Sequence, residues 1–577
     1  MCCRRRRCLA RAQQAWWQEP GPRSAPAQSA SLPSPPPDIP STHAGPRPPS
    51  AHGSPVSSRW VRREIRKLDV PDRERILRAM EIMYTTDLEE GRELYGKKFK
   101  SSGYFAATHS ATLTYCYHWG IMFGTTHPAF QLEFEDSIRA IDPRISGMFY
   151  WDYFQDDARF GSDWWSQSEI YRDDWFGAVD QSKDDQYQVL TGRFAHTKVP
   201  THRPEAPFEL ANYNSYGDMG QVCNQVSSSV IQRSVEFCGI KTQLRLASAD
   251  DMISCFMNST RLQEWDLCLE KSVHGNLHSL QGGAWDCNND LQKMVDSDPV
   301  KYPQKVMDYI GVSSFNMWFK EMAGAVESFS CKEKGDKDWP CARDDGECAM
   351  LNKTIDYSQL TDVEIYEVGG NVIMEFMFET QWGNEFIEPV GPHSQDKELL
   401  KLGATYKWKH LPASEQVEFQ RWLMEYASNP GKSGIASTGA APADPLFWVW
   451  HSIFDRALHV LRMSEHFKST YNMQWVPTSW THCGGQLEDH LPFKNIFDDA
   501  AKDHHFTNKE LWMLLDPTNQ HLPYIYDDLT TWGEQYWDAF FLTVKKGQDR
   551  GDFANPDAPA NDDFWKGAPE SSESELA

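Results

Sequence analysis

The pattern of apolar and polar positions predicts a mainly α-helical fold. Residues 104–139 carry apolar side chains at the spacing of two helices joined by a short loop. The same helical spacing recurs in residues 249–278 and in residues 444–464. One run, Val372 to Phe378, is almost continuously apolar, and we expect it to form a strand. Residues 155–250 show no clear period and predict long irregular connections between the helices.

The two ends of the chain differ in composition from its centre. Residues 1–58 are rich in Pro and Arg, which predicts a disordered leader. Residues 531–577 are acidic and contain Pro, Asn and Asp, which predicts a partly disordered tail. Between them we expect an ordered region, residues 59–530, in which Asp69 and Pro71 mark the start of an early helix.

The composition limits the kinds of partner. The net charge of −25 argues against a nucleic-acid partner. No apolar run reaches the roughly 18–20 residues that span a bilayer, so we expect no transmembrane segment. Aromatic residues make up 13% of the chain, which suits an aromatic core or pocket for a small molecule. The sequence does not indicate an oligomeric state.

The cysteines and the glycosylation sequons favour a secreted or lumenal protein. Cys331, Cys341 and Cys348 lie close together in a polar stretch, which predicts a loop held by disulfides. Sequons begin at Asn258 and Asn352. The basic start of the chain is not followed by an apolar segment, so it is not a recognisable signal peptide.

The candidate chemistry begins in residues 444–456, DPLFWVWHSIFDR. On a helix, His451 and Asp455 would share a face. A carboxylate in that position can fix the tautomer and the direction of a histidine that binds a metal. We therefore expect His451 to be a metal ligand and Asp455 to support it.

A second candidate pair is His274 and His278, which are four residues apart and would point the same way from one helix. Gly275 stands where the zinc-protease pattern H-E-x-x-H requires Glu, so that activity is excluded. An isolated pair with this spacing is also compatible with two surface or capping histidines.

The third group is His109, His118 and His127, which follow one another at intervals of nine residues. Taken alone, this spacing is also compatible with chance. With the other three histidines, however, the chain offers six imidazoles and requires no thiolate ligand. Such a set suits two copper ions better than zinc, calcium or magnesium.

These motifs resemble those of the tyrosinase family, the type 3 copper proteins that include catechol oxidases and hemocyanins. The segments YCYHWGIMFGTTHPAFQLEFED and FYWDYF resemble the first copper segment of that family and the motif after it. HGNLHSLQGG and DPLFWVWHSIFDR resemble the two halves of the second copper segment. VRREIRKL and the Y-x-Y of Tyr524 to Tyr526 resemble the ends of the family's core, so the resemblance spans about residues 59–530.

The resemblance implies a central antiparallel helical bundle that houses two copper ions, copper A and copper B. It implies O2 as co-substrate and the oxidation of phenols or catechols to o-quinones in an aromatic pocket. It also implies a thioether between Cys116 and the ring of His118, although a free cysteine or a disulfide remains an alternative. By resemblance, the ligands are His109, His118 and His127 for copper A, and His274, His278 and His451 for copper B.

The chain departs from the family pattern after His274. In several members that hydroxylate monophenols, an Asn follows this histidine and acts on the phenol proton together with a nearby Glu. Gly275 has no side chain for this role, and Glu264 and Glu270 are the candidate glutamates. The sequence therefore favours oxidation of catechols, with hydroxylation of monophenols left open.

The second departure is the 172 residues between His278 and His451, where the family has a few tens. A structureless loop of that length is improbable, so we expect the insertion, about residues 290–440, to fold and to include a helix at residues 415–426. It could form a lid over the site or a peripheral decoration.

A different class of function also fits the motifs. Trp450 stands before His451, where many tyrosinases have a second His and many hemocyanins a bulky apolar residue. This residue favours a dioxygen carrier without turnover, whereas the absence of tandem oxygen-binding units in the sequence favours an enzyme.

Overall fold

The computed structural model describes residues 59–110, 118, 121–199, 229–317, 356–391, 396–427, 431–477, 485–494, 496–497 and 504–529. All of these belong to the unit Ser57–Ala577. The predicted leader and tail, Cys116, the group Cys331, Cys341 and Cys348, and the sequon at Asn352 lie outside the described residues.

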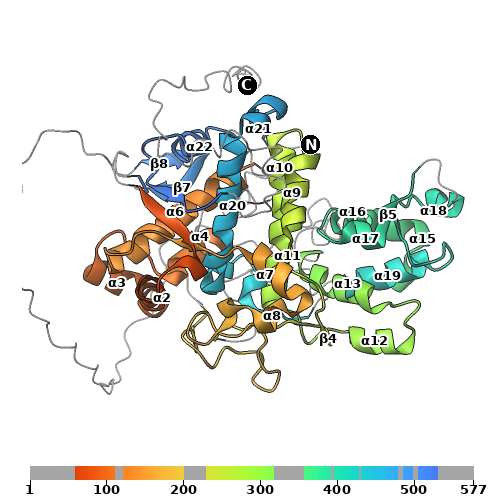
Figure 1. Cartoon of the computed structure of the whole chain (residues 1–577). Helices are drawn as coiled ribbons and strands as arrows, with labels where there is room; N and C mark the ends of the chain where they lie inside the picture. The colour runs from red at the N-terminus through yellow and green to blue at the C-terminus, as the bar shows by residue number, and fades with distance from the viewer. Residues whose placement is uncertain are drawn as a thin grey trace, which may run out of the picture. The chain divides into compact units, whose positions relative to one another are not determined.

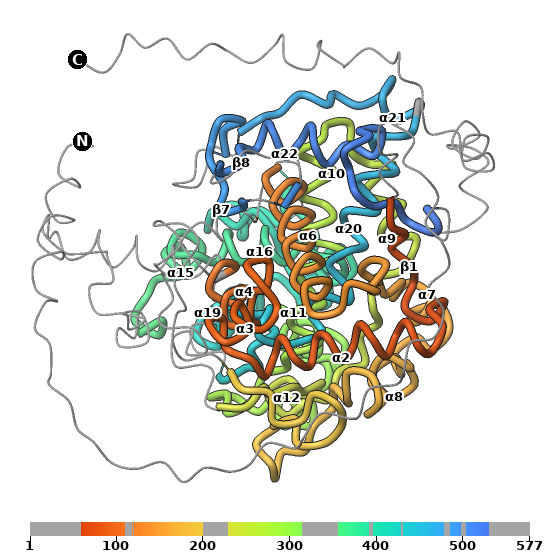
Figure 2. The backbone as a smooth tube through the Cα atoms, turned by 90° about the vertical axis from the view of Figure 1, so that its left-hand side faces the viewer, coloured from red at the N-terminus to blue at the C-terminus, as the bar shows by residue number. Residues whose placement is uncertain are grey.

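The fold is mainly α, as the sequence predicts. Helix α20 (Leu446–Met463) and the helical stretch α9 to α11 stand beside each other at the centre of Figure 1, and Figure 2 shows α6 next to α20. Asp444 starts α20 because its carboxylate accepts a hydrogen bond from the Leu446 amide at 2.9 Å. Every residue of α20 except Met463 is buried, so this helix forms the centre of the core.

The predicted helix start at Asp69 is confirmed. Helix α2 (Val70–Thr85) begins with the side chain of Asp69 accepting from the Asp72 amide, and Pro71 stands in the first turn. The predicted helix pair in residues 104–139 corresponds to α4 (Ser102–Ser110) and α6 (Phe123–Ile141).

A small parallel sheet joins the two ends of the described region. Strand β1 (Trp60–Glu64) lies between β2 (Phe149–Tyr150) and β9 (Tyr524–Tyr526), with Arg62 paired to Tyr526. The opening and closing motifs of the sequence therefore meet in space, beside helix α20.

The described part of the insertion folds as expected, but its predicted strand is wrong. Residues Asn371–Phe378 form helix α16, which follows a segment started by a capping box of Thr361 and Glu364. The apolar run was ambiguous in period, and its buried residues Ile373, Met374, Phe376 and Met377 recur at helical spacing. The predicted helix at residues 415–426 is confirmed as α19 (Gln416–Ala427).

Two disulfides flank the histidine pair His274 and His278, which lies on η6 and α11. Cys255–Cys268 joins α9 to α10, and Cys238–Cys287 joins the hairpin β3–β4 to the segment after α11. Neither of these two bonds involves Cys331, Cys341 or Cys348, the cysteines for which the sequence predicts disulfides.

The remaining elements connect these parts. Within the described residues, no helix combines the length and the apolar character needed to cross a membrane. The other helices are α3 (Leu88–Tyr95), α7 (Tyr153–Phe160), α8 (Trp164–Gln167), α9 (Ala249–Asn258), α10 (Leu262–Cys268), η6 (Leu269–His274), α11 (Gly275–Gly282), α12 (Leu291–Ser297), α13 (Gln304–Met317), α15 (Asp362–Ile365), η9 (Tyr366–Gly370), α17 (Gly383–Phe386), α18 (Lys397–Lys401), α21 (Glu465–Thr470) and α22 (Asn508–Leu514). Short 3-10 turns are η1 (Ile65–Lys67), η2 (Gly161–Asp163), η3 (Glu169–Tyr171), η8 (Tyr357–Gln359), η10 (Ile435–Ser437) and η11 (Ala441–Ala443), and the short strands are β3 (Glu236–Phe237), β4 (Ile240–Lys241), β5 (Ile387–Pro389), β6 (Tyr406–Trp408), β7 (His490–Lys494) and β8 (His505–Thr507).

Candidate metal centre

The fold brings the six candidate histidines into two groups of three. In each group, one ligand nitrogen from each ring lies within 4.8 Å of the others. Helices α4 and α6 carry two members of the first group, and η6, α11 and α20 carry the second. None of the six side chains is more than 9% exposed. The groups are His109, His118 and His127, and His274, His278 and His451.

Backbone carbonyls orient several of these rings. The Nδ1 atoms lie at hydrogen-bond distance from a carbonyl oxygen: His109 from Gly439 at 2.6 Å, His278 from Ala436 at 2.7 Å, and His451 from Phe447 at 2.5 Å. A ring that donates from Nδ1 keeps the lone pair of Nε2 available for a metal.

The Nε2 atoms of the second group converge. The Nε2 atom of His274 lies 2.8 Å from that of His278 and 3.1 Å from that of His451. In the first group, Nε2 of His127 is buried and has no hydrogen-bond partner among the described residues. Converging or orphaned nitrogen lone pairs of this kind fit a bound metal ion.

The two groups face each other. The rings of His127 and His451 are stacked with centroids 5.6 Å apart, and those of His118 and His274 are stacked at 6.1 Å. Each group therefore presents imidazoles to the other across a short gap, as two adjacent metals require.

Three of the six imidazoles are held in the neutral form. Burial lowers the pKa of His127, His274 and His451 well below the ordinary value of 6.5, and the neighbouring imidazoles lower it further. Neutral rings bind a transition metal without first losing a proton.

Aromatic side chains enclose the histidines. Phe447 stacks on His451 with centroids 3.6 Å apart, and Phe123 lies 4.1 Å from His127. Trp450, which is 1% exposed, lies 4.9 Å from the ring of His278. These rings cover the histidines and leave them little contact with water.

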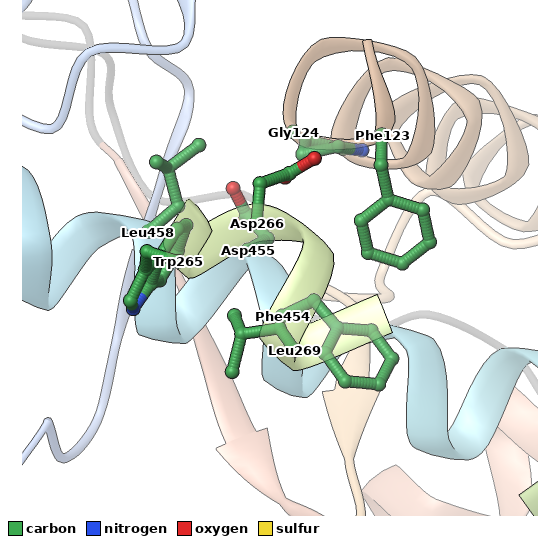
Figure 3. A pocket seen from close by; sticks show the side chains of 9 residues that line it. Phe123, Gly124, Trp265, Asp266, Leu269, Phe454, Asp455 and Leu458 are labelled. Atoms are coloured by element: carbon green, nitrogen blue, oxygen red, sulfur yellow. The ribbon is translucent and has the colours of Figure 1, made fainter. Parts of the chain in front are cut away.

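Phe123 and Phe454, which both contact the ring of His274, also line a small cavity (Figure 3). The carboxyl group of Asp266 reaches into it towards Gly124, where an added Cβ would lie 3.4 Å from Asp266 Oδ1. Burial, and then the charge of Glu270, raise the pKa of Asp266 well above 3.8. Burial therefore favours the protonated form of this carboxyl group. The lining residues are Phe123, Gly124, Pro128, Trp265, Asp266, Leu269, Phe454, Asp455 and Leu458.

The expected support of His451 by Asp455 is wrong. The Nδ1 atom of His451 meets the Phe447 carbonyl one turn earlier on its own helix, so that position is taken by the backbone. Asp455 Oδ2 instead accepts hydrogen bonds from Tyr524 and Tyr526, both at 2.7 Å, and from Arg62 at 3.1 Å.

The two candidate glutamates differ in their surroundings. Glu264 is exposed and accepts hydrogen bonds from the amide and the hydroxyl of Thr260. Glu270 is 1% exposed and lies on η6, one helical turn before His274. Of the two, only Glu270 belongs to the interior near the metal centre.

The roles of the carbonyl groups of Ala436, Gly439 and Phe447 could not be expected from the sequence. A backbone carbonyl leaves no signature in residue type, so only the fold identifies it as a partner of a ring nitrogen. Phe447 lies within the segment DPLFWVWHSIFDR, but its stacking on His451 was not predicted from the sequence.

Comparison with known proteins agrees with this geometry. Residues 100–319 match the profile of the tyrosinase family, described as the common central domain of tyrosinase. The matched range includes five of the six histidines and ends before His451. No curated protein matches the chain.

Proposed function

Residues 100–319 of this chain belong to the tyrosinase family, and on that premise we propose that the protein is a dinuclear copper oxidase of catechols. Two catechols would give four electrons and four protons to one O2, which yields two o-quinones and two water molecules. The observation that carries the proposal is the pair of facing triads of buried imidazoles, of which His127, His274 and His451 have a pKa lowered by burial.

In this proposal, copper A is held by His109, His118 and His127, and copper B by His274, His278 and His451. When bound, the two copper ions supply Lewis acidity and the capacity to accept two electrons and to bind O2. The chain orients His109, His278 and His451 through Nδ1 contacts to carbonyl groups. Burial keeps His127, His274 and His451 neutral. Its aromatic walls exclude water and position a flat phenolic ring.

Gly275 bears on whether monophenols are also hydroxylated. This residue has no side chain, and a Cβ added there would lie 3.3 Å from the Glu270 carbonyl oxygen. A larger residue at this position would have to shift the backbone or its neighbour. Oxidation of catechols is therefore the main proposed activity, and paired rates on tyrosine and its catechol measure how far hydroxylation is retained.

A second candidate function is a dioxygen carrier with the same metals. Trp450 favours it, because a buried indole beside His278 narrows the approach of a phenol to copper B. Rapid oxidation of a simple catechol by the copper-loaded protein supports the oxidase. Failure of that reaction in mild detergent, while addition of hydrogen peroxide still changes the absorption spectrum, supports the carrier.

The copper assignment is tested by metal analysis of purified variants. The wild-type protein should hold two copper ions, and His278→Ala should lose copper B and the oxidase activity. His459→Ala is the matched control, because His459 is a buried histidine of α20 whose ring stacks on Tyr524 and belongs to neither triad. Retention of both ions by His278→Ala contradicts the ligand assignment.

We also propose that the protein folds in a secretory or lumenal compartment. The disulfides Cys238–Cys287 and Cys255–Cys268 support this, because such bonds persist in oxidising compartments. Asn258 is exposed at the end of α9, in a position open to glycosylation. Protein isolated from its own cells should carry both disulfides and a glycan on Asn258, whereas four free thiols would contradict the proposal.

A further inference from the structure

Residues 433–444, which we name the strap, contact both histidine triads. The Ala436 carbonyl oxygen lies 2.7 Å from His278 Nδ1, and the Gly439 carbonyl oxygen lies 2.6 Å from His109 Nδ1. One short segment thus orients a ring of the second group and a ring of the first. The two carbonyl groups are only three residues apart, so a shift of the strap moves both contacts.

The start of the strap is fixed to the end of helix α11. The Gly434 amide donates to the Gly282 carbonyl at 3.1 Å, and the Ser433 hydroxyl donates to the Gly283 carbonyl at 2.7 Å. The Ser437 hydroxyl donates to the carbonyl of His278 itself at 3.1 Å. This end therefore follows the helix that carries the copper B pair.

The other end is fixed to the core by a buried ion pair. Arg233 donates to both carboxylate oxygens of Asp444, each at 2.7 Å, and neither side chain is exposed. Tyr84 donates to the Pro442 carbonyl at 2.6 Å and accepts from the Trp448 indole at 2.9 Å. Paired, fully buried groups of this kind hold a backbone in one position.

We propose that the strap is a positioning element shared by the two metals, which sets the aim of His109 and His278 together. The proposal rests on the copper centre proposed above and adds a dependence between its two halves. Because the strap has anchors at both ends, displacing it at one point should disturb both triads rather than one.

Gly282 is the point at which the strap can be displaced. A Cβ added there would lie 2.0 Å from Ser437 Oγ, 3.0 Å from Ser437 Cβ and 3.1 Å from its backbone nitrogen. The space between helix α11 and the strap at Gly282 therefore leaves no room for a side chain. A methyl group at this position clashes with Ser437, and we expect Ser437 to move together with the neighbouring carbonyl of Ala436, away from His278.

The test is copper content and the spectrum after addition of hydrogen peroxide, measured on full-length Gly282→Ala. We expect this variant to lose both copper ions to a similar degree. Gly282→Ala combined with Ser437→Gly should recover them, because the second change removes Oγ and Cβ and leaves only the backbone contact. Ser437→Gly alone should lose less copper than Gly282→Ala, because it removes one hydrogen bond and leaves the Gly434 and Ser433 contacts with the end of α11 in place.

Gly91→Ala is the control for overpacking. Gly91 lies in helix α3, which carries no candidate ligand. A Cβ added there would lie 1.9 Å from the ring of Phe99. Gly91→Ala should lower the unfolding temperature and keep both copper ions. Retention of both ions by Gly282→Ala, or loss of one ion only, overturns the shared role of the strap. A wild-type protein that binds no copper overturns the proposed function, and the strap with it.

Discussion

Arg62 Nη1 lies 3.1 Å from Asp455 Oδ2, and neither side chain is accessible to solvent. The contact joins the first strand of the fold to helix α20, which carries His451. Arg62 also donates to Glu135 of α6 at 2.9 Å. A single guanidinium therefore ties together two helices that carry ligands of different triads, His127 on α6 and His451 on α20.

Asp455→Asn should therefore act mainly on stability. It removes one of the two carboxylates that compensate the buried charge of Arg62, and breaking a buried pair costs about 3–5 kcal/mol. We expect a loss of that order in the free energy of unfolding of the copper-free protein, measured by chemical denaturation. Tyr524→Phe, which removes one hydrogen bond to the same oxygen, should cost about 1 kcal/mol.

The opposite pattern would restore the interpretation drawn from the sequence. If Asp455→Asn left the unfolding free energy unchanged and weakened only the binding of copper B, Asp455 would support His451 in solution. The bond between His451 and the Phe447 carbonyl makes the first pattern the expected one.

The candidate ligands could be predicted because ligand atoms belong to side chains. The spacing of four residues between His274 and His278 predicts that both side chains point the same way from a helix. The other candidates could be recognised as histidines in the family's motifs, namely His109, His118 and His127. Helix α20 was equally predictable, since an Asp-Pro start precedes a long apolar stretch.

The role of Asp455 could not be predicted in the same way. Its spacing from His451 is correct for contact on a helix, but the spacing carries no information on competing partners. Its partner Arg62 lies 393 residues earlier in the chain. The other two partners, Tyr524 and Tyr526, follow it by 69 and 71 residues. The three-dimensional fold alone decides which of the possible partners the carboxylate takes.

The disulfide pairing was hidden for a related reason. Ten cysteines outside the leader permit many pairings, and closeness along the sequence drew attention to Cys331, Cys341 and Cys348. The described bonds join cysteines that the packing of helices α9 and α10 and the hairpin β3–β4 brings together.

The two disulfides should contribute to retention of copper B. Cys268 lies six residues before His274, and Cys287 lies nine residues after His278, so the bonds flank the pair. In the chain-entropy description, the loop of Cys255–Cys268 is worth about 3 kcal/mol and that of Cys238–Cys287 about 4 kcal/mol. Replacing either pair by serines should lower the unfolding free energy accordingly.

The same variants should lose copper B more readily than copper A. Titration with a copper chelator, followed by metal analysis, gives the order in which the two ions leave. Equal release of both ions in the serine variants and in the wild-type protein would show that the disulfides stabilise the fold without favouring either site.

Asp308 predicts a dependence of stability on pH. Burial raises the pKa of its carboxyl group to about 6, although the Gln243 amide donates to it at 2.7 Å. The folded state holds this proton more tightly than the unfolded state, where the pKa is near 3.8. The contribution of Asp308 to the free energy of unfolding is therefore fully present below about pH 4. It should fall as the pH rises to about 6, by on the order of 2–3 kcal/mol.

The measurement compares the wild-type protein with Asp308→Asn over this pH range. The difference between the two unfolding free energies isolates Asp308, because other buried carboxyl groups contribute equally to both curves. The unfolding free energy of the variant should rise relative to that of the wild-type protein as the pH rises from about 4 to about 6. A constant difference would mean that Asp308 does not change its protonation on unfolding.

Trp450 should control the size of the substrate that reaches copper B. Its ring lies 4.9 Å from that of His278 and 6.4 Å from that of His274. Trp450→Phe removes part of this wall and should lower the KM for bulky catechols more than the KM for catechol itself, with similar copper content. Trp448→Phe is the matched control, since this neighbouring indole stacks on Phe134 with centroids 3.8 Å apart. If both variants changed the two KM values in parallel, Trp450 would act through the core of α20 and not through access to the metal.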